Sequence, residues 1–181
     1  MPQSVIEPSV VLFTIFILLT GAERIVELFT SLNHARWAFA RGGVESGRGH
    51  YPAMVALHSG LLVGSLAEVW LLGRPFIPLL GWPMLAIAVL CQIGRIWIIR
   101  SLGKQWNTRI IVVPGMPLSR RGPYRWARLP HPNYLLVAVE GLAIPLVHTA
   151  FITAGVFAVL NAILLIGFRI PAEDRALRAA G

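Results

Sequence analysis

Apolar residues are gathered into long runs along the chain, and short polar segments separate the runs. The runs cover residues 9–29, 51–72, 76–99, 133–147 and 150–168. A helix needs about 20 apolar residues to cross the hydrocarbon part of a bilayer. The pattern therefore predicts an all-α integral membrane protein with about five transmembrane helices.

The first run contains three charges, at Glu23, Arg24 and Glu27, yet its apolar pattern continues past them to Phe29. No basic segment precedes the run, and no small-residue cleavage site follows it. We therefore predict a retained membrane helix in place of a signal peptide. Charges at this depth are expected to face the protein interior.

The remaining segments organise the chain as one membrane-embedded domain over residues 1–181. Residues 1–99 carry the first three helices, and the polar, glycine-rich segment 33–50 between the first two predicts a loop. The last two apolar runs are separated by a short turn and predict a helical hairpin. A short amphipathic tail helix is expected to start at Pro171.

Charge orients the predicted helices in the membrane. The 16 basic residues exceed the eight acidic ones, which gives a net charge of +8. With the N-terminus outside, five spans place every basic cluster on the cytoplasmic side, as the positive-inside rule requires. The charge then serves as an orientation signal and contacts lipid headgroups. We expect no nucleic-acid partner, because no basic tract with interleaved aromatic residues of a nucleic-acid-binding kind sits on a recognisable fold.

Several common chemistries are excluded by the residues present. The single cysteine, Cys91, excludes disulfides within the chain and cysteine-rich zinc sites. The five histidines lack metal-ligand spacing, so we expect no metal site. The nearest glycine-rich turn, at residues 47–49, lacks a third glycine and a preceding strand, which argues against a dinucleotide fold. Asp174 is the sole aspartate and no nucleophile-elbow motif occurs, so a serine triad is poorly supported.

A first candidate constellation surrounds the start of the fourth run. Gly122-Pro123-Tyr124 precedes the sequence HPNY at residues 131–134. Pro132 suits the first turn of a helix, whose free N–H groups and positive dipole end favour an anion. The alternative is an interfacial helix with Tyr134 in an aromatic belt. Glu140 lies further along the run and is either a site residue or a helix-packing residue.

A second candidate constellation follows the last run. Arg169 offers a forked donor to an anionic oxygen. Glu173, one turn later, would meet the opposite charge, and Asp174 follows it. The alternative is that both acids compensate the dipole of the tail helix.

In this order, the motifs resemble those of the isoprenylcysteine carboxyl methyltransferase family of integral membrane enzymes. The resemblance covers residues 106–177 and includes the R-x-x-x-E sequence from Arg169 to Glu173. The N-terminal half, with ERIVEL and NHARWAFARGGVESGRGHYPAMVALH, is similar to a bacterial branch of that family. Members of this branch are associated with type III polyketide synthases and methylate alkylpyrones or alkylresorcinols.

The resemblance implies an S-adenosylmethionine-dependent O-methyltransferase of the bacterial inner membrane, with a cytoplasmic cofactor pocket. Its acceptor would be a lipophilic small molecule: an alkylpyrone or alkylresorcinol hydroxyl, or a prenylcysteine-like carboxylate. Membrane lipids and a functional link to a type III polyketide synthase are the expected partners. The contrasting hypothesis is a non-enzymatic small membrane protein, transporter-like or a scaffold subunit.

The resemblance also assigns residues to roles. Arg169 matches the arginine at the substrate, and we expect it to be catalytic. Glu140 is our further catalytic candidate, as a base for a hydroxyl acceptor, with His131 or a water as alternatives. The family reads Arg-His-Pro without a break, whereas Leu129 and Pro130 separate Arg128 from His131 here. The expected cofactor-binding residues are Met116, Pro117, Leu118, Ser119, Tyr124, His131, Pro132, Asn133, Tyr134 and Glu173.

Polar residues of the first two runs have two possible uses. They pair with one another, or they line a route for the lipophilic substrate, and we favour pairing. The residues concerned are Glu23, Arg24, Glu27, His58 and Glu68.

Overall fold

The computed structural model describes residues 7–117, 119–125 and 131–180, and this part of the chain is mostly helical. The α-helices are α1 (Pro8–Phe39), α2 (Tyr51–Leu72), α3 (Pro78–Leu102), α4 (Pro132–Leu146), α5 (Phe151–Leu164) and α6 (Ile170–Ala180). The short elements are η1 (Arg48–His50), η2 (Gly103–Gln105), η3 (Gly122–Arg125) and the π-helical turn η4 (Leu165–Arg169). Two strands, β1 (Val44–Ser46) and β2 (Ile110–Val112), complete the fold.

Helix α1 is longer than the sequence predicts. It runs for 32 residues to Phe39, so the first part of the predicted loop at 33–50 is helical. The prediction was wrong here because a buried stripe of small residues, Ser31, Ala35 and Ala38, continues at helical spacing beyond the apolar run. At 1.5 Å per residue the helix is about 48 Å long and extends beyond a bilayer core.

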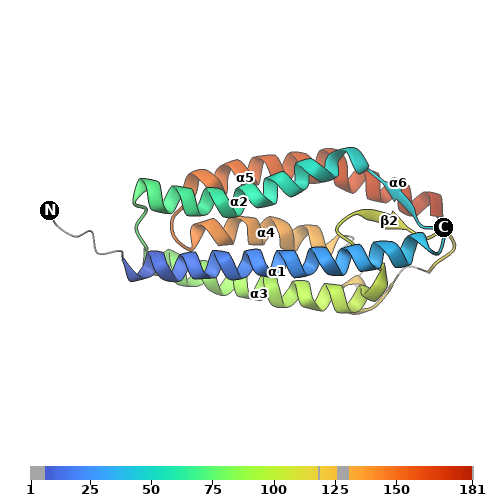
Figure 1. The fold of residues 1–181 in the computed structure, drawn as a ribbon, viewed down its shortest axis with the longest axis horizontal. Coiled ribbons are helices and arrows are strands. Elements are labelled where there is room, and N and C mark those ends of the chain that lie inside the picture. The colour runs from blue at the N-terminus through green and yellow to red at the C-terminus, as the bar shows by residue number, and fades with distance from the viewer. Residues whose placement is uncertain (1–6, 118, 126–130, 181) are drawn as a thin grey trace.

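Helix α4 lies in the middle of the bundle, in contact with α2, α3 and α5 (Figure 1). In the described part of the chain, four helices are long and apolar enough to cross a membrane, and α4 is a shorter apolar helix of 15 residues. Four of the five predicted spans thus reach bilayer length. One face of α4 packs on its neighbours, with Gly141, Ala143 and Ile144 buried, and its other face exposes Leu135 and Leu142.

Close packing and a helix cap hold α5 against its neighbours. Gly141 of α4 lies so near Phe157 of α5 that a Cβ at this position would overlap the phenyl ring. Glu68 of α2 accepts hydrogen bonds from the N–H groups of Ile152 and Thr153, at 3.0 and 2.7 Å. The Glu68 carboxylate therefore caps the N-terminus of α5, where a negative charge is favoured.

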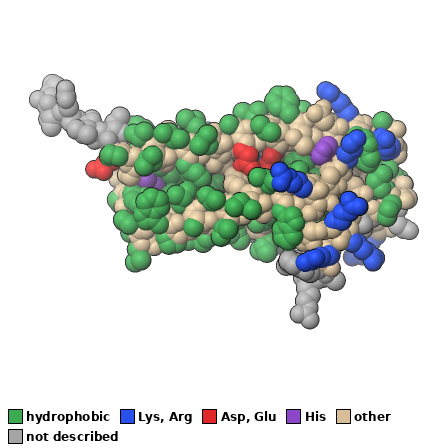
Figure 2. Space-filling view, turned by 90° about the horizontal axis from the view of Figure 1, so that it is seen from below, with side chains coloured by type: hydrophobic (Ala, Val, Ile, Leu, Met, Phe, Trp, Pro, Cys, Tyr) green, Lys and Arg blue, Asp and Glu red, His purple; other side chains and the backbone are tan. Residues whose placement is uncertain are grey.

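The outer surface is apolar along the helices and basic at one end of the molecule. Large apolar side chains such as Leu18, Leu71, Leu90 and Ile166 are exposed along the helices. Lys and Arg side chains gather at the end of the molecule where β2 and α6 lie (Figures 1 and 2). An exposed apolar surface of this extent suits lipid, so the protein is an integral membrane protein.

The two strands form a small antiparallel sheet that the all-α prediction lacks. Val44 pairs with Val112, and Ser46 pairs with Ile110. The strands have three residues each and lie more than 60 residues apart in the chain, so no hairpin signal marks them. The sheet joins the segment after α1 to the segment after α3 at the basic end.

Candidate functional site

A cavity of about 360 Å³ lies at the basic end; we call it the terminal cavity. Its walls come from the end of α1, from segments 102–113 and 116–124, from the start of α4 and from α6. Seven of the residues expected to bind the cofactor line it: Met116, Ser119, Tyr124, His131, Asn133, Tyr134 and Glu173.

The other expected cofactor residues are placed differently. Pro117 and Pro132 are not among the lining residues. The carbonyl of Pro117 accepts a hydrogen bond from Gln105 at 2.9 Å, and Pro132 is buried in the first turn of α4. Leu118 and segment 126–130, which contains Arg128 and the two residues after it, lie outside the described residues.

The starts of α4 and α6 are tied together at the terminal cavity. The hydroxyl of Tyr134 donates a hydrogen bond to Glu173. The imidazole of His131 stacks on the Tyr134 ring at 5.3 Å and lies 3.2 Å from a carboxylate oxygen of Asp174. Glu173 lies one turn after Arg169 in α6, which continues η4 without a break, and it faces the cavity.

Tyr124 contributes a neutral hydroxyl to this cavity. Burial raises the pKa of its phenol above the ordinary value, and the nearby negative charge of Glu173 raises it further. The side chain therefore remains a protonated donor throughout the neutral pH range.

Arg169 carries a buried positive charge. It ends the π-helical turn η4, a type of turn that is frequent at functional sites, and is 5% exposed. One guanidinium nitrogen donates to the carbonyl of Thr108 at 3.1 Å, and the group lies 5.6 Å from the centre of the Tyr134 ring. Within residues 7–117, 119–125 and 131–180, no carboxylate forms an ion pair with it. A buried charge of this kind favours an anionic ligand.

A second cavity, of about 320 Å³, lies among the apolar helices; we call it the bundle cavity. It is lined by residues of α1 to α5, by segment 106–108 and by η4. Five residues line both cavities, and we call them the junction: Trp106, Asn107, Asn133, Tyr134 and Arg169.

Three atoms of the junction are buried and lack hydrogen-bond partners in the described part of the chain. They are Nε1 of Trp106, Oδ1 of Asn133 and Nε of Arg169. A buried polar atom without a partner costs about 1–3 kcal/mol. Three such atoms at one place indicate a site that is completed by a ligand.

Four charged side chains form a cluster on the wall of the bundle cavity. Glu140 of α4 accepts hydrogen bonds from both Arg24 of α1 and Arg95 of α3. Glu27 lies 2.7 Å from Arg24 and 3.4 Å from Arg95. The expected pairing of polar residues therefore occurs for Arg24 and Glu27, and both also line the cavity. The Glu140 carboxylate therefore joins α4 to α1 and α3, and its role as a base stays a prediction.

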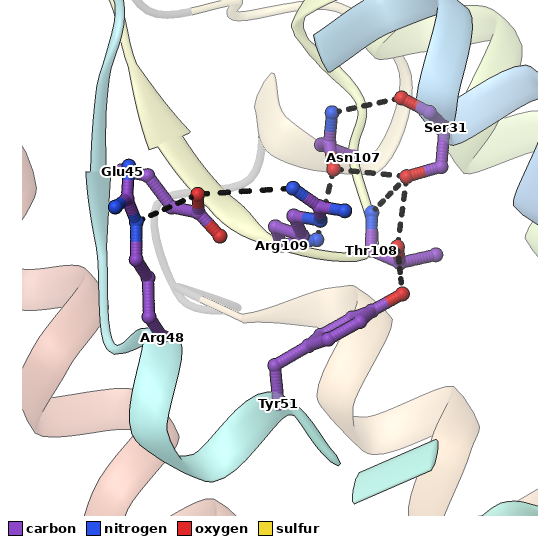
Figure 3. A network of polar contacts seen from close by, with 7 residues as sticks. All are labelled: Ser31, Glu45, Arg48, Tyr51, Asn107, Thr108 and Arg109. Atoms are coloured by element: carbon purple, nitrogen blue, oxygen red, sulfur yellow. Dashed lines mark hydrogen bonds and ion pairs between the residues drawn. The ribbon is translucent and has the colours of Figure 1, made fainter.

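A network of polar contacts fixes segment 107–109 to the first two helices (Figure 3). The hydroxyl of Ser31 on α1 contacts Asn107 at 2.9 Å and Thr108 at 2.8 Å, and it accepts a bond from the N–H of Thr108. Tyr51 at the start of α2 contacts the Thr108 hydroxyl at 3.2 Å. Since the carbonyl of Thr108 holds Arg169, this network supports the junction from the N-terminal half.

Sequence reasoning missed the junction residues that precede the motifs. Trp106, Asn107 and Thr108 lie in the part of the chain that resembles the family, but the resemblance assigns them no role, and only the fold brings them to Arg169. Arg95 had a usable signal, because an arginine at the end of an apolar run needs a partner. Among the described residues, no group of three or more His, Cys, Asp or Glu side chains could hold a metal ion.

Comparisons with known proteins identify the family of this chain. Residues 84–179 match the model of the isoprenylcysteine carboxyl methyltransferase (ICMT) family. The chain is 38% identical over 168 residues to an uncharacterized protein, YpbQ, of Bacillus subtilis (strain 168), covering 92% of this chain and 97% of that protein. No solved structure matches the chain. The family match includes the motifs at residues 131–134 and 169–173. The chain belongs to the isoprenylcysteine carboxyl methyltransferase family of membrane methyltransferases.

Proposed function

We propose that this protein transfers a methyl group from S-adenosylmethionine to an oxygen atom of a lipophilic acceptor. The observation that carries the proposal is the junction. There a cavity at the basic end and a cavity inside the apolar bundle share the buried cation Arg169. A water-soluble cofactor and a lipid-like acceptor can thus approach one point from opposite sides.

The charged side chains that line the terminal cavity are complementary to the charged groups of S-adenosylmethionine. The carboxylate of Glu173 suits a cationic part of the cofactor, and Lys104 and Arg120 suit its carboxylate. The Oδ1 of Asn133, which has no hydrogen-bond partner among the described residues, is buried at the same wall. When bound, the cofactor supplies an electrophilic methyl group on a positively charged sulfur.

The bundle cavity fits the acceptor. Ile25, Leu28 and Val55 line this cavity and are also exposed on the outer surface of α1 and α2. The cavity therefore opens toward lipid, and an acceptor with an alkyl or prenyl chain enters from the bilayer. Its reactive oxygen then lies at the junction.

Arg169 holds that oxygen as an anion. Methyl transfer needs positioning and electrostatic stabilisation more than covalent catalysis. A neighbouring guanidinium favours the ionised form of a carboxyl or enol group. The acceptor is then a prenylcysteine-like carboxylate or the hydroxyl of an alkylpyrone or alkylresorcinol. The polyketide-derived acceptors would link the protein functionally to a type III polyketide synthase.

The orientation in the membrane follows from the basic end. Positively charged ends stay cytoplasmic, so the terminal cavity and the C-terminus lie in the cytoplasm. The start of α1 lies at the opposite end of the molecule (Figure 1), so we expect the N-terminus to be outside. In a bacterium this places the protein in the inner membrane, where the cofactor is available.

Calorimetric binding of S-adenosylhomocysteine to the purified protein in lipid nanodiscs tests the cofactor half of the proposal. We expect saturable binding, and Glu173→Gln should weaken it about tenfold or more, because a charged partner is lost. Glu7→Gln is the matched control, since Glu7 is exposed just before α1 and does not line the cavity. Absence of binding by folded protein would favour the non-enzymatic scaffold or transporter-like alternative.

A further inference from the structure

We propose that the indole N–H of Trp106 binds the acceptor oxygen together with Arg169, so that the two side chains form a two-donor cradle for an oxyanion. This inference rests on the proposed methyl transfer and adds a residue to the acceptor side of the site. Trp106 lies at the start of the region that resembles the family, where the resemblance assigns it no role, and the structure brings it to the junction.

The position of Trp106 supports this role. The residue is 4% exposed, yet it lines both the terminal cavity and the bundle cavity. Its Nε1 is buried and meets no acceptor among the described residues. An indole N–H is a donor only, so its partner must be an acceptor atom, and the two cavities are where such an atom can lie.

Arg169 presents a second unused donor at the same junction. Its Nη2 is occupied by the carbonyl of Thr108, whereas its Nε is buried without a partner in the part of the chain that the structure describes. An oxyanion has enough lone pairs to accept from both Nε of Arg169 and Nε1 of Trp106. It would also neutralise the buried charge of the guanidinium.

The backbone of Trp106 is anchored, which makes the donor preorganised. The Nδ1 of His34 on α1 donates to the carbonyl of Trp106 at 2.8 Å, and the His34 ring packs edge-on against the indole at 6.2 Å. The next two residues are held by Ser31 through the network in Figure 3. Donors fixed before the reaction stabilise charge without reorganisation.

The cradle gives the transfer step a simple charge balance. The acceptor oxyanion forms a bond to the methyl carbon while the carbon–sulfur bond breaks, and the electron pair of that bond stays on sulfur. The negative charge on oxygen and the positive charge on sulfur disappear together, and no proton moves. The methylated oxygen is neutral and accepts more weakly from two donors, which favours release of the product.

Nuclear magnetic resonance of ¹⁵N-labelled tryptophan tests the cradle without turnover. The protein in nanodiscs is saturated with S-adenosylhomocysteine and titrated with dodecanoate, a long-chain anion, or with dodecanol, its neutral counterpart. The chain has six tryptophans, and the Trp106 indole signal is identified by its loss in Trp106→Phe. We expect this signal to move downfield saturably with dodecanoate and to stay in place with dodecanol.

The Phe variant also separates binding of the acceptor from binding of the cofactor. Trp106→Phe keeps an aromatic ring and removes the donor, so we expect dodecanoate affinity to fall about tenfold with S-adenosylhomocysteine affinity unchanged. Trp82→Phe, at an exposed position on α3, is the control and should change neither.

Three results would overturn the inference. The indole signal could move with S-adenosylhomocysteine alone, in which case Trp106 donates to the cofactor. Both Phe variants could bind dodecanoate as the wild type does, or the signal could stay in place with dodecanoate. Failure of the wild type to bind S-adenosylhomocysteine would overturn the proposed function as well, and this outcome is separate from the other three.

Discussion

The terminal cavity and the bundle cavity differ in how the chain builds their walls. Most of the terminal cavity comes from two neighbouring segments, 102–124 and 131–134, and residues 169–177 complete it. The bundle cavity takes residues from all of the helices α1 to α5 and from segment 106–108. Local motifs therefore describe one wall of the terminal cavity, whereas only tertiary packing describes the bundle cavity.

The two cavities also differ in how their charges are held. Glu173 and Asp174, at the terminal end, have side chains that are 32% and 41% exposed. Glu140 and Arg95, at the bundle cavity, are 4% and 7% exposed and pair with each other. Changes at the terminal cavity should therefore act on ligand binding, whereas changes at the bundle cavity should act first on stability.

Glu140→Ala should give the largest effect and tests this contrast most strongly. Removal of one partner from a buried ion pair costs about 3–5 kcal/mol, and here two arginines lose their shared acceptor. We expect a marked fall in the Tm of the protein in detergent, with S-adenosylhomocysteine affinity unchanged in the protein that remains folded at low temperature.

Glu23→Ala is the matched control for this change. Glu23 lies on α1 beside Arg24, is only half-buried, and forms no ion pair within the described ranges. Its replacement should lower Tm much less. Equal Tm values for the two variants would show that the cluster of four charges does not stabilise the bundle.

Gly141→Ala should give an intermediate effect, on the close approach of α4 and α5. The added methyl group overlaps Phe157, and overpacking of this kind costs about 1–3 kcal/mol. Phe157 also lines the bundle cavity, so we expect weaker dodecanoate binding together with a lower Tm.

Gly155→Ala, on α5, is the matched control, because a Cβ at this position would have no neighbour within 4 Å among the described residues. It should leave dodecanoate binding unchanged and keep or raise Tm, since alanine favours helix over glycine. A lower Tm in Gly155→Ala than in Gly141→Ala would contradict the packing observed between α4 and α5.

Ser31→Ala should give the smallest effect, because it loosens the junction without removing a junction residue. It deletes the hydroxyl that holds Asn107 and the N–H of Thr108, a loss of about 1 kcal/mol. We expect a few-fold weaker binding of dodecanoate. Thr30→Ala, whose hydroxyl bonds only to the carbonyl of Val26 on its own helix, should bind as the wild type does.

Much of the fold could be predicted from the sequence because hydrophobic periodicity reports burial in lipid. The helices α2, α3 and α5 begin and end near the edges of the apolar runs. The extension of α1 to Phe39 was missed because small residues, not large apolar ones, form its buried stripe. The sheet of β1 and β2 was missed because its three-residue strands pair across distant segments.

The candidate site, like the fold, could be predicted from the sequence only in part. The motifs at residues 131–134 and 169–173 identified one wall of the terminal cavity, including Tyr134 and Glu173. They gave no information on Trp106 or Thr108, which reach the junction through contacts with α1. Glu140 was correctly singled out as a buried charge, but its partners Arg24 and Arg95 follow only from the fold.

Transfer of a tritiated methyl group from S-adenosylmethionine to a chloroform-soluble product tests the central claim most directly. The purified protein is supplied with an undecyl hydroxypyrone, a pentadecylresorcinol or acetyl-farnesylcysteine, and wild type is compared with Arg169→Ala. We expect label in at least one lipophilic product, and a loss of about 10²–10³-fold in Arg169→Ala with S-adenosylhomocysteine affinity unchanged. Equal transfer by the two proteins would contradict a reaction at the junction.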